Sequence, residues 1–205
     1  GLVFASVSSA FATTYPVTIE NCGYKETFTK APERVVALGQ NTVEILLLLG
    51  LEDIVVASAF WPTKVLPSLA EKNSKIKNLT VEIPTLESIL AQNPDFVPAQ
   101  IPLLLGPESK VAKREDFATV GVNSYMSPGM CATKKGVGDM YGSRQKLWDM
   151  SFLYQEIMDF ATIFNVEDRG NALIADFKKR ENNLRAEFSK NKKDLSFVFW
   201  FSSSS

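Results

Sequence analysis

Short apolar runs alternate with segments of helical spacing in the first part of the chain. The runs at 34–38 and 54–58 are apolar at almost every position, which is typical of parallel strands covered on both faces. Between them, residues 42–49 have helical spacing and stop at Gly50, with Asn41 as the expected N-cap. This order predicts a strand–helix–strand unit.

The same alternation continues to about residue 126. Pro84 marks the start of one further helix, and turn residues separate the later strands. The fold class predicted is α/β, an open parallel sheet of four strands with three helical crossovers, behind an N-terminal hairpin. The remaining elements are expected at 17–20 and 26–28 for the hairpin, 85–91 and 108–119 for helices, and 95–97 and 121–126 for strands.

The second half of the chain has a different pattern. Residues 143–164 have apolar side chains every three or four positions, and a longer, heavily charged helix is expected over 165–191. A buried-type strand follows at 195–201. The expected organisation is an α/β lobe at 13–164, a long backbone helix at 165–191, and at 192–205 the first strand of a truncated second lobe.

The first residues are typical of a processing signal. An apolar run at 2–7 precedes Ala10-Phe11-Ala12, an A-x-A cleavage pattern, so residues 1–12 are interpreted as a signal-peptide remnant of an exported protein. The alternative is a plain apolar strand. In an oxidising compartment Cys22 and Cys131 are expected to form a disulfide, with two buried thiols as the alternative. Closing so long a loop contributes on the order of 4–5 kcal/mol in the chain-entropy description.

Composition and charge exclude several function classes. The 22 basic and 23 acidic residues leave a net charge of −1, without the basic excess that nucleic-acid binding requires. The chain has no histidine and only two cysteines, so no metal site is predicted, although an iron site of carboxylates and tyrosines stays open. It also has no nucleophile elbow, no P-loop and no dinucleotide fingerprint after a strand, which disfavours an enzyme.

Candidate binding residues follow the predicted strands, because ligands of open parallel sheets bind outside the carboxyl ends of the strands. Trp61 offers a flat ring for stacking, with packing beneath its own loop as the equal alternative. The amides of Gln40 and Gln100 are suited to donate to chelate oxygens. The full predicted set is Gln40, Asn41, Phe60, Trp61, Gln100 and Ser127.

Several short patterns, in this order, resemble the class III periplasmic binding proteins of ABC importers, the group that carries ferric siderophores, haem and cobalamin. The resemblance covers about residues 17–201. The patterns are Ile19-Glu20-Asn21-Cys22-Gly23, Ala31-Pro32-Glu33-Arg34-Val35-Val36, Asn41-Thr42-Val43-Glu44-Ile45-Leu46 through Leu49-Gly50-Leu51, Pro84-Thr85-Leu86-Glu87-Ser88-Ile89, Asn93-Pro94-Asp95-Phe96-Val97 and Ile163-Phe164-Asn165-Val166.

The resemblance implies two lobes joined by one backbone helix, with the ligand in the cleft between them. It implies a periplasmic protein that binds an iron chelate, a ferric siderophore, without a cofactor and delivers it to the membrane permease subunits of an ABC importer. Haem, cobalamin or a metal ion is the alternative cargo. An α/β enzyme is a further alternative function, which the sequence favours less. Glu87 matches the family's docking glutamate. Its alternative is an ordinary first-turn glutamate favoured by the helix dipole.

Overall fold

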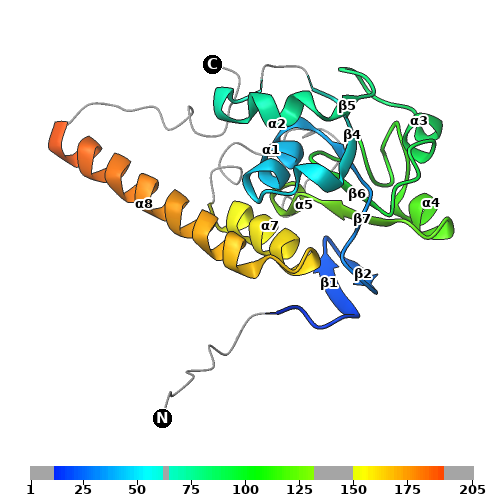
Figure 1. Ribbon diagram of the computed structural model, residues 1–205, viewed down its shortest axis with the longest axis horizontal. Helices are drawn as coiled ribbons and strands as arrows, with labels where there is room; N and C mark the ends of the chain where they lie inside the picture. Colours follow the sequence, from blue (N-terminus) through cyan, green and yellow to red (C-terminus); the bar gives the residue numbers. More distant parts are fainter. Residues whose placement is uncertain (1–11, 62–64, 132–149, 192–205) are drawn as a thin grey trace, which may run out of the picture.

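The computed structural model describes residues 12–61, 65–131 and 150–191. Its centre is a five-stranded sheet in the order β5-β4-β3-β6-β7, in which every neighbouring pair is parallel (Figure 1). The α/β prediction is therefore confirmed. The strands are β3 (Val35–Leu38), β4 (Val55–Ala59), β5 (Lys77–Asn78), β6 (Phe96–Ala99) and β7 (Asn123–Met126).

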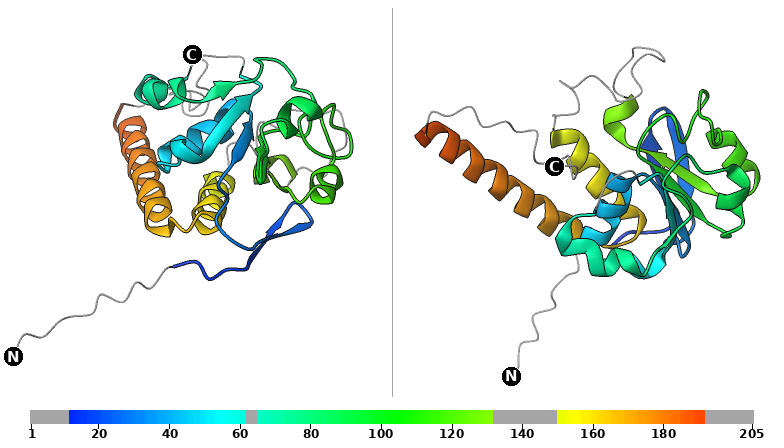
Figure 2. Two further views of the ribbon diagram at one scale, coloured as in Figure 1. Left: turned by 45° about the vertical axis from the view of Figure 1, so that its right-hand side comes forward. Right: turned by 90° about the horizontal axis from the view of Figure 1, so that it is seen from above.

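The central strand β3 is buried on both faces, as its apolar run predicts. All four of its residues are completely buried, and successive side chains enter two different core clusters. Val35 and Ala37 face α1 (Gln40–Leu48) and α7 (Met150–Ile163), whereas Val36 and Leu38 face α3 (Leu86–Leu90) and α4 (Arg114–Thr119). The two views in Figure 2 show the sheet between these helical layers.

The order of the strands reverses next to β3. From β3 the chain moves to β4 and then β5 on one side, and it returns to place β6 and β7 on the other side. The connections on the first side also contain the 3-10 turns Glu52–Ile54 and Pro67–Leu69 and the short helix α2 (Ala70–Ser74). The switch point therefore lies between β3 and β6, and in open parallel sheets ligands bind outside such a point.

The hairpin of β1 (Val17–Asn21) and β2 (Tyr24–Phe28) is closed by a two-residue turn. Cys22 and Gly23 both have positive φ, 52° and 83°, which is the combination that a type I′ turn requires. Asn21 then pairs with Tyr24 across the turn.

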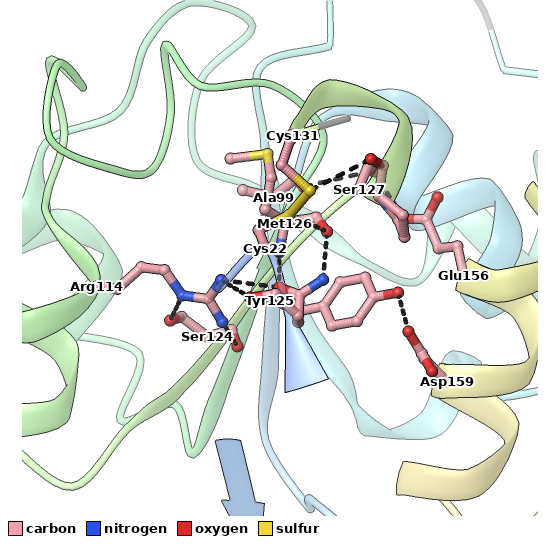
Figure 3. Close-up of a disulfide and its surroundings, with 12 residues drawn as sticks. Cys22, Ala99, Arg114, Ser124, Tyr125, Met126, Ser127, Cys131, Glu156 and Asp159 are labelled. Carbon is pink, nitrogen blue, oxygen red and sulfur yellow. Dashed lines mark hydrogen bonds between the residues drawn. A yellow bond between two sulfur atoms is a disulfide. The ribbon is translucent and has the colours of Figure 1, made fainter. Parts of the chain in front are cut away.

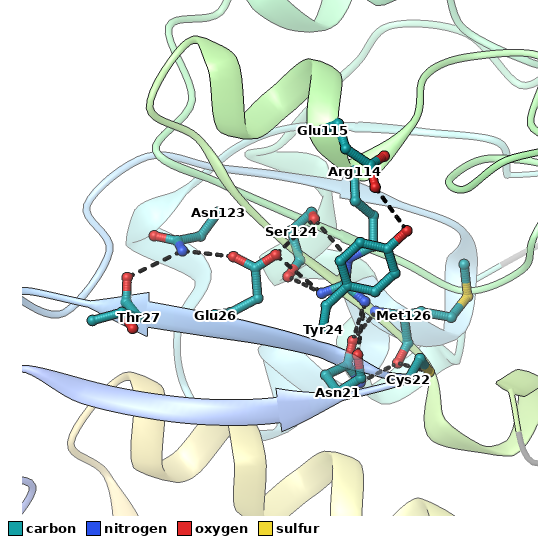
Figure 4. A network of polar contacts seen from close by, with 10 residues as sticks. All are labelled: Asn21, Cys22, Tyr24, Glu26, Thr27, Arg114, Glu115, Asn123, Ser124 and Met126. Atoms are coloured by element: carbon teal, nitrogen blue, oxygen red, sulfur yellow. Dashed lines mark hydrogen bonds and ion pairs between the residues drawn. The ribbon is translucent and has the colours of Figure 1, made fainter.

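A buried arginine fastens this hairpin to the sheet (Figure 4). Arg114 of α4 donates to the Oγ and carbonyl of Ser124, to the carbonyl and side chain of Asn21, and to Glu26, whose Oε1 lies 3.1 Å from Nη2. Its guanidinium also stacks over the Tyr24 ring at 4.3 Å. A buried charge is tolerated only when it is paired and hydrogen-bonded in this way.

The long helix predicted over 165–191 is confirmed as α8 (Glu167–Asn191). Leu173, Ile174 and Phe177 of α8 pack against the core cluster that also contains α1 and α7. The rest of the helix extends away from the sheet (Figure 1). No helix within the described residues is both long enough and apolar enough to cross a bilayer.

Three local expectations are corrected. The N-cap of α1 is Gly39, and Asn41 lies inside the helix. The helix expected at 108–119 begins only at Arg114, because the Oγ of Ser109 accepts the backbone N–H groups of Val111 and Ala112 and holds a turn there. The exposed edge strand β5 was not predicted, since its two residues are lysine and asparagine. The expectations for residues 1–11 and 192–205, and the part of the helix expected at 143–164 that precedes Met150, lie outside the described ranges.

The Arg114 network yields a first prediction. Replacing Arg114 with methionine removes the buried guanidinium and leaves the half-buried Glu26 without its cationic partner, so we expect the free energy of unfolding to fall by about 3 kcal/mol. The double change Arg114→Met with Glu26→Gln should cost less than the single one. Urea denaturation measures both. The control is Arg185→Ala, because the Arg185 side chain is exposed in its ion pair with the half-buried Glu181, and its loss should change stability by less than about 1 kcal/mol. Equal losses in R114M and R185A contradict the prediction.

Candidate functional site

The loops that follow the strands meet at one edge of the sheet, which we call the carboxyl edge and define as residues 39–41, 60–61, 100 and 127. Each loop continues the parallel ladder by one residue, because its first backbone N–H donates to the last carbonyl of a neighbouring strand or its extension. The pairs are Phe60 to Thr80 (3.0 Å), Gly39 to Ala59 (2.8 Å), Gln100 to Leu38 (2.9 Å) and Ser127 to Ala99 (3.0 Å). The loops that carry the predicted residues therefore form one continuous edge.

At the switch point the backbone of Gly39 lies directly against Gln100. An added Cβ on Gly39 would be 2.5 Å from the Cβ of Gln100, and Gly39 has a φ of 105°. The Oε1 of Gln100 accepts the backbone N–H of Asn41 at 3.1 Å. Gln100 thus caps the N-terminus of α1 from the opposite side of the switch point, a role that Gly39 cannot fill because it has no side chain.

Gln40 points beneath the edge. Its side chain is 5% exposed, and Nε2 donates to Oε1 of the buried Glu44 at 3.1 Å. Burial raises the pKa of Glu44, although the hydrogen bonds from Gln40 and from the backbone of Leu66 oppose the increase. Asn41, in contrast, is only half-buried. The two adjacent residues predicted to contact ligand therefore differ in accessibility.

Trp61 packs in the core, which agrees with the second of the two alternatives given for it above. Its ring is 6% exposed and belongs to the core cluster that includes Leu69 and Ile76, so no open flat face lies at the edge. The preceding residue, Phe60, is half-buried in a left-handed conformation, with a φ of 61°. A non-glycine residue at positive φ costs energy and is frequent at functional sites. A ligand contact by either residue stays a prediction.

Two buried acids of α7 lie behind the end of β7 (Figure 3). The Ser127 hydroxyl donates to Oε1 of Glu156 at 2.8 Å, and the Tyr125 hydroxyl donates to Oδ2 of Asp159 at 2.6 Å. Burial raises the pKa of Glu156 to about 7; the Ser127 hydrogen bond opposes this increase and the charge of Asp159 adds to it. Burial likewise raises the pKa of Asp159. Tyr125 is a core residue, as expected from its strand.

These acids were not among the predicted site residues, although a signal was present. Glu156 and Asp159 are three positions apart and fall on the same helical side as the apolar Ile157, Phe160 and Ile163. Charged residues within an apolar stripe indicate a buried polar contact.

The Cys22–Cys131 disulfide is confirmed. The two Cα atoms are 5.5 Å apart, and the bridge joins the hairpin turn to the end of α5 (Pro128–Cys131).

Glu87 is exposed in the first turn of α3, whose N-cap Thr85 accepts the Ser88 N–H at 3.1 Å. This position is compatible with docking and with the helix-dipole alternative, so docking stays a prediction. Among the described residues, no three His, Cys, Asp or Glu side chains are arranged to hold a metal ion.

Comparison with known proteins defines the class of the chain. The family model for periplasmic binding proteins matches residues 35–205. The chain therefore belongs to the periplasmic binding protein family, in agreement with the resemblance found in its motifs. No curated protein matches it significantly.

Solved structures support the same assignment. An ABC-type Fe3+-hydroxamate transport system from Saccharomonospora viridis is 30% identical, with a TM-score of 0.61 over 82% of this chain and 55% of that chain. A periplasmic binding protein from Veillonella parvula is 25% identical, with a TM-score of 0.70 over 88% and 55%. The catecholate-siderophore binding protein VctP from Vibrio cholerae, at 19% identity, a TM-score of 0.59 and coverage of 87% and 56%, shares the fold. The chain spans about half the length of these structures.

The close approach at the switch point gives a second prediction. Gly39→Ala combines an unfavourable backbone conformation, φ 105° and ψ 145°, with a collision against Gln100, whereas Gly121 has a φ of 75° and nothing within 4 Å of an added Cβ. We expect Gly39→Ala to lower the free energy of unfolding by at least about 1 kcal/mol more than Gly121→Ala. Chemical denaturation of both variants measures the difference. Equal effects show that Gln100 moves aside without cost.

The buried Glu156 gives a third prediction. Its pKa in the folded protein is raised from 4.5 to about 7, so the folded state holds the proton more tightly than the unfolded state. The contribution of Glu156 to stability is therefore fully present below pH 4.5 and is lost as the pH rises through 7, with about 3 kcal/mol lost by pH 7. Glu156→Gln should remove this part of the decrease. Urea denaturation from pH 4.5 to 7.5 compares the variant with wild type, and parallel curves contradict the prediction.

Proposed function

We propose that this protein binds a ferric siderophore at the carboxyl edge and delivers it to the permease of an ABC importer. The observation that carries the proposal is the set of loop residues converging at the switch point between β3 and β6 in a chain of the periplasmic binding protein family. Such a family member captures its ligand without chemical change, so the edge needs hydrogen-bond donors and shape rather than a nucleophile.

The cargo is inferred from the solved structure that has a higher sequence identity to this chain than the two others described above. The Saccharomonospora viridis protein, 30% identical, is a Fe3+-hydroxamate transport protein. Gln100 and Asn41 supply amide groups suited to the oxygen atoms of such a chelate. The absence of histidine from the sequence favours an intact chelate over haem or a bare transition metal, for which imidazole is a common ligand.

In the proposed mechanism, capture relies on closing two lobes about the long helix α8. A continuous helix is a stiff connection, which favours a small hinge motion. The loaded protein then docks through acidic residues, for which Glu87 is the candidate in the described part. Charge pairs of this kind set the orientation and rate of docking more than its affinity.

The test of the cargo is a titration of the protein with a ferric hydroxamate, a ferric catecholate, haem and cobalamin, followed by isothermal calorimetry. We expect saturable binding of one ferric chelate and none of its iron-free form. Saturation by haem or cobalamin instead selects the alternative cargo. No binding by any of the four to a folded preparation refutes the proposal.

The test of the edge uses Gln100→Ala. This change removes the cap of α1 and an amide from the switch point, so we expect about tenfold weaker chelate binding. Glu33→Gln is the matched control, because Glu33 is an exposed residue just before β3, at the opposite edge of the sheet. Equal affinity in both variants excludes the switch point as the binding site.

A further inference from the structure

The disulfide reaches the carboxyl edge. Cys131 ends α5, a single helical turn that follows directly after Ser127 at the end of β7. Cys22 lies in the turn of the hairpin, 109 positions earlier in the chain. The bridge therefore ties one end of the candidate ligand-binding edge to an element outside the sheet (Figure 3).

The hairpin end of the bridge is already fixed without it. The side-chain amide of Asn21 makes two hydrogen bonds of 2.8 Å to the backbone of Met126, one to the carbonyl and one from the N–H. Arg114 adds its hydrogen bonds to Asn21 and Glu26 (Figure 4). Losing the bridge would leave these contacts in place.

The other end has weaker support. The backbone bond from the Met130 N–H to the Ser127 carbonyl, 3.0 Å, closes one turn, and a single turn is unstable in isolation. Gly129 packs near Phe152 of α7, since an added Cβ would lie 3.7 Å from the Cβ of Phe152, and the half-buried Met130 packs against the core cluster of α3 and α4. None of the four residues of α5 is fully buried. A covalent link at Cys131 therefore restrains α5 more than it restrains the hairpin.

The bridge is also within reach of solvent. Cys131 is exposed and Cys22 is half-buried, so a thiolate can attack a sulfur atom without unfolding the sheet. Accessible disulfides are the ones that exchange readily. Attack by a dithiol forms a mixed disulfide and releases one protein thiol. The second thiol of the reagent then displaces the other cysteine, so the protein gains two thiols and the dithiol becomes a cyclic disulfide.

We propose that the Cys22–Cys131 bridge is a redox-sensitive brace that holds α5 beside the carboxyl end of β7, and that a dithiol opens it in the folded protein. Opening the bridge frees α5 while β3 and β6 stay paired. The inference rests on the proposed function only in treating this end of β7 as part of a ligand site.

The first experiment measures reduction of the native protein by dithiothreitol, with free thiols trapped by iodoacetamide and counted by mass spectrometry. We expect a rate that rises in proportion to the dithiothreitol concentration and does not change in about 1 M urea, a concentration taken to be below the unfolding transition. A rate that reaches a plateau, and that urea accelerates steeply, means that reduction requires global unfolding and overturns the proposal.

The second experiment compares amide hydrogen exchange in wild type and in the double variant C22S/C131S. We expect the amide of Met130 to lose at least about ten times more protection than those of Gly39, Gln100 and Ser127, which report on the sheet ladder. Glu26→Gln is the matched control, because it loosens the hairpin but keeps the bridge, so protection in α5 should remain. Equal loss at all four amides, or an unfolded double variant, shows that the bridge stabilises the whole fold rather than α5 and overturns the proposal.

Hydrogen exchange is measured without ligand, so it is independent of the cargo. If no chelate binds to wild type, the proposed function fails and the exchange result still decides the role of the bridge. If a ferric chelate binds, we expect about tenfold weaker binding by C22S/C131S, and an unchanged affinity overturns the positioning role.

Discussion

The complete burial of β3 is the constraint on which the rest of the structure depends. A strand with core on both faces must give every backbone group a partner, so β3 is paired on both sides and its ladder continues into the loops beyond it. The chain then has to leave the sheet at once and begin α1 beside Gln100. Only a residue without a Cβ fits there, which is why Gly39 stands at the switch point. The polar groups that remain accessible at the carboxyl edge follow from this close packing of Gly39 against Gln100.

Much of the fold could be predicted because it is encoded in local patterns. The buried runs at β3 and β4, the Pro84 boundary and the charged periodicity of α8 each predict their own element. The short edge strand β5 could not be predicted from Lys77 and Asn78, since its pairing with β4 depends on a neighbour rather than on its own propensity. The shortened α4 has a similar origin, because a side-chain turn at Ser109 competes with the helix.

The sequence predicted which loops form the candidate site, but not how their side chains lie. A general rule about parallel sheets selected the carboxyl edge as the candidate, and the backbone ladder brings its loops together. The rule says nothing about which side chains turn inward. Trp61 is buried because its ring packs in the core, and Gln40 is buried because its amide donates to Glu44. The acids behind Ser127 belong to a helix that is distant in sequence. Contacts of this kind depend on tertiary packing, which single-sequence patterns do not specify.

The helix α8 has a mechanical consequence. Its first turns are fitted into the core by Leu173, Ile174 and Phe177, and Tyr154 of α7 still contacts it at Lys178 and Glu181. From Phe177 the helix continues for about 21 Å to Asn191, at 1.5 Å per residue. A rotation of about 10° at Phe177 would move the far end by about 4 Å, given this length. A change in the packing of these three apolar side chains would therefore be amplified into a larger displacement of the C-terminal end of α8.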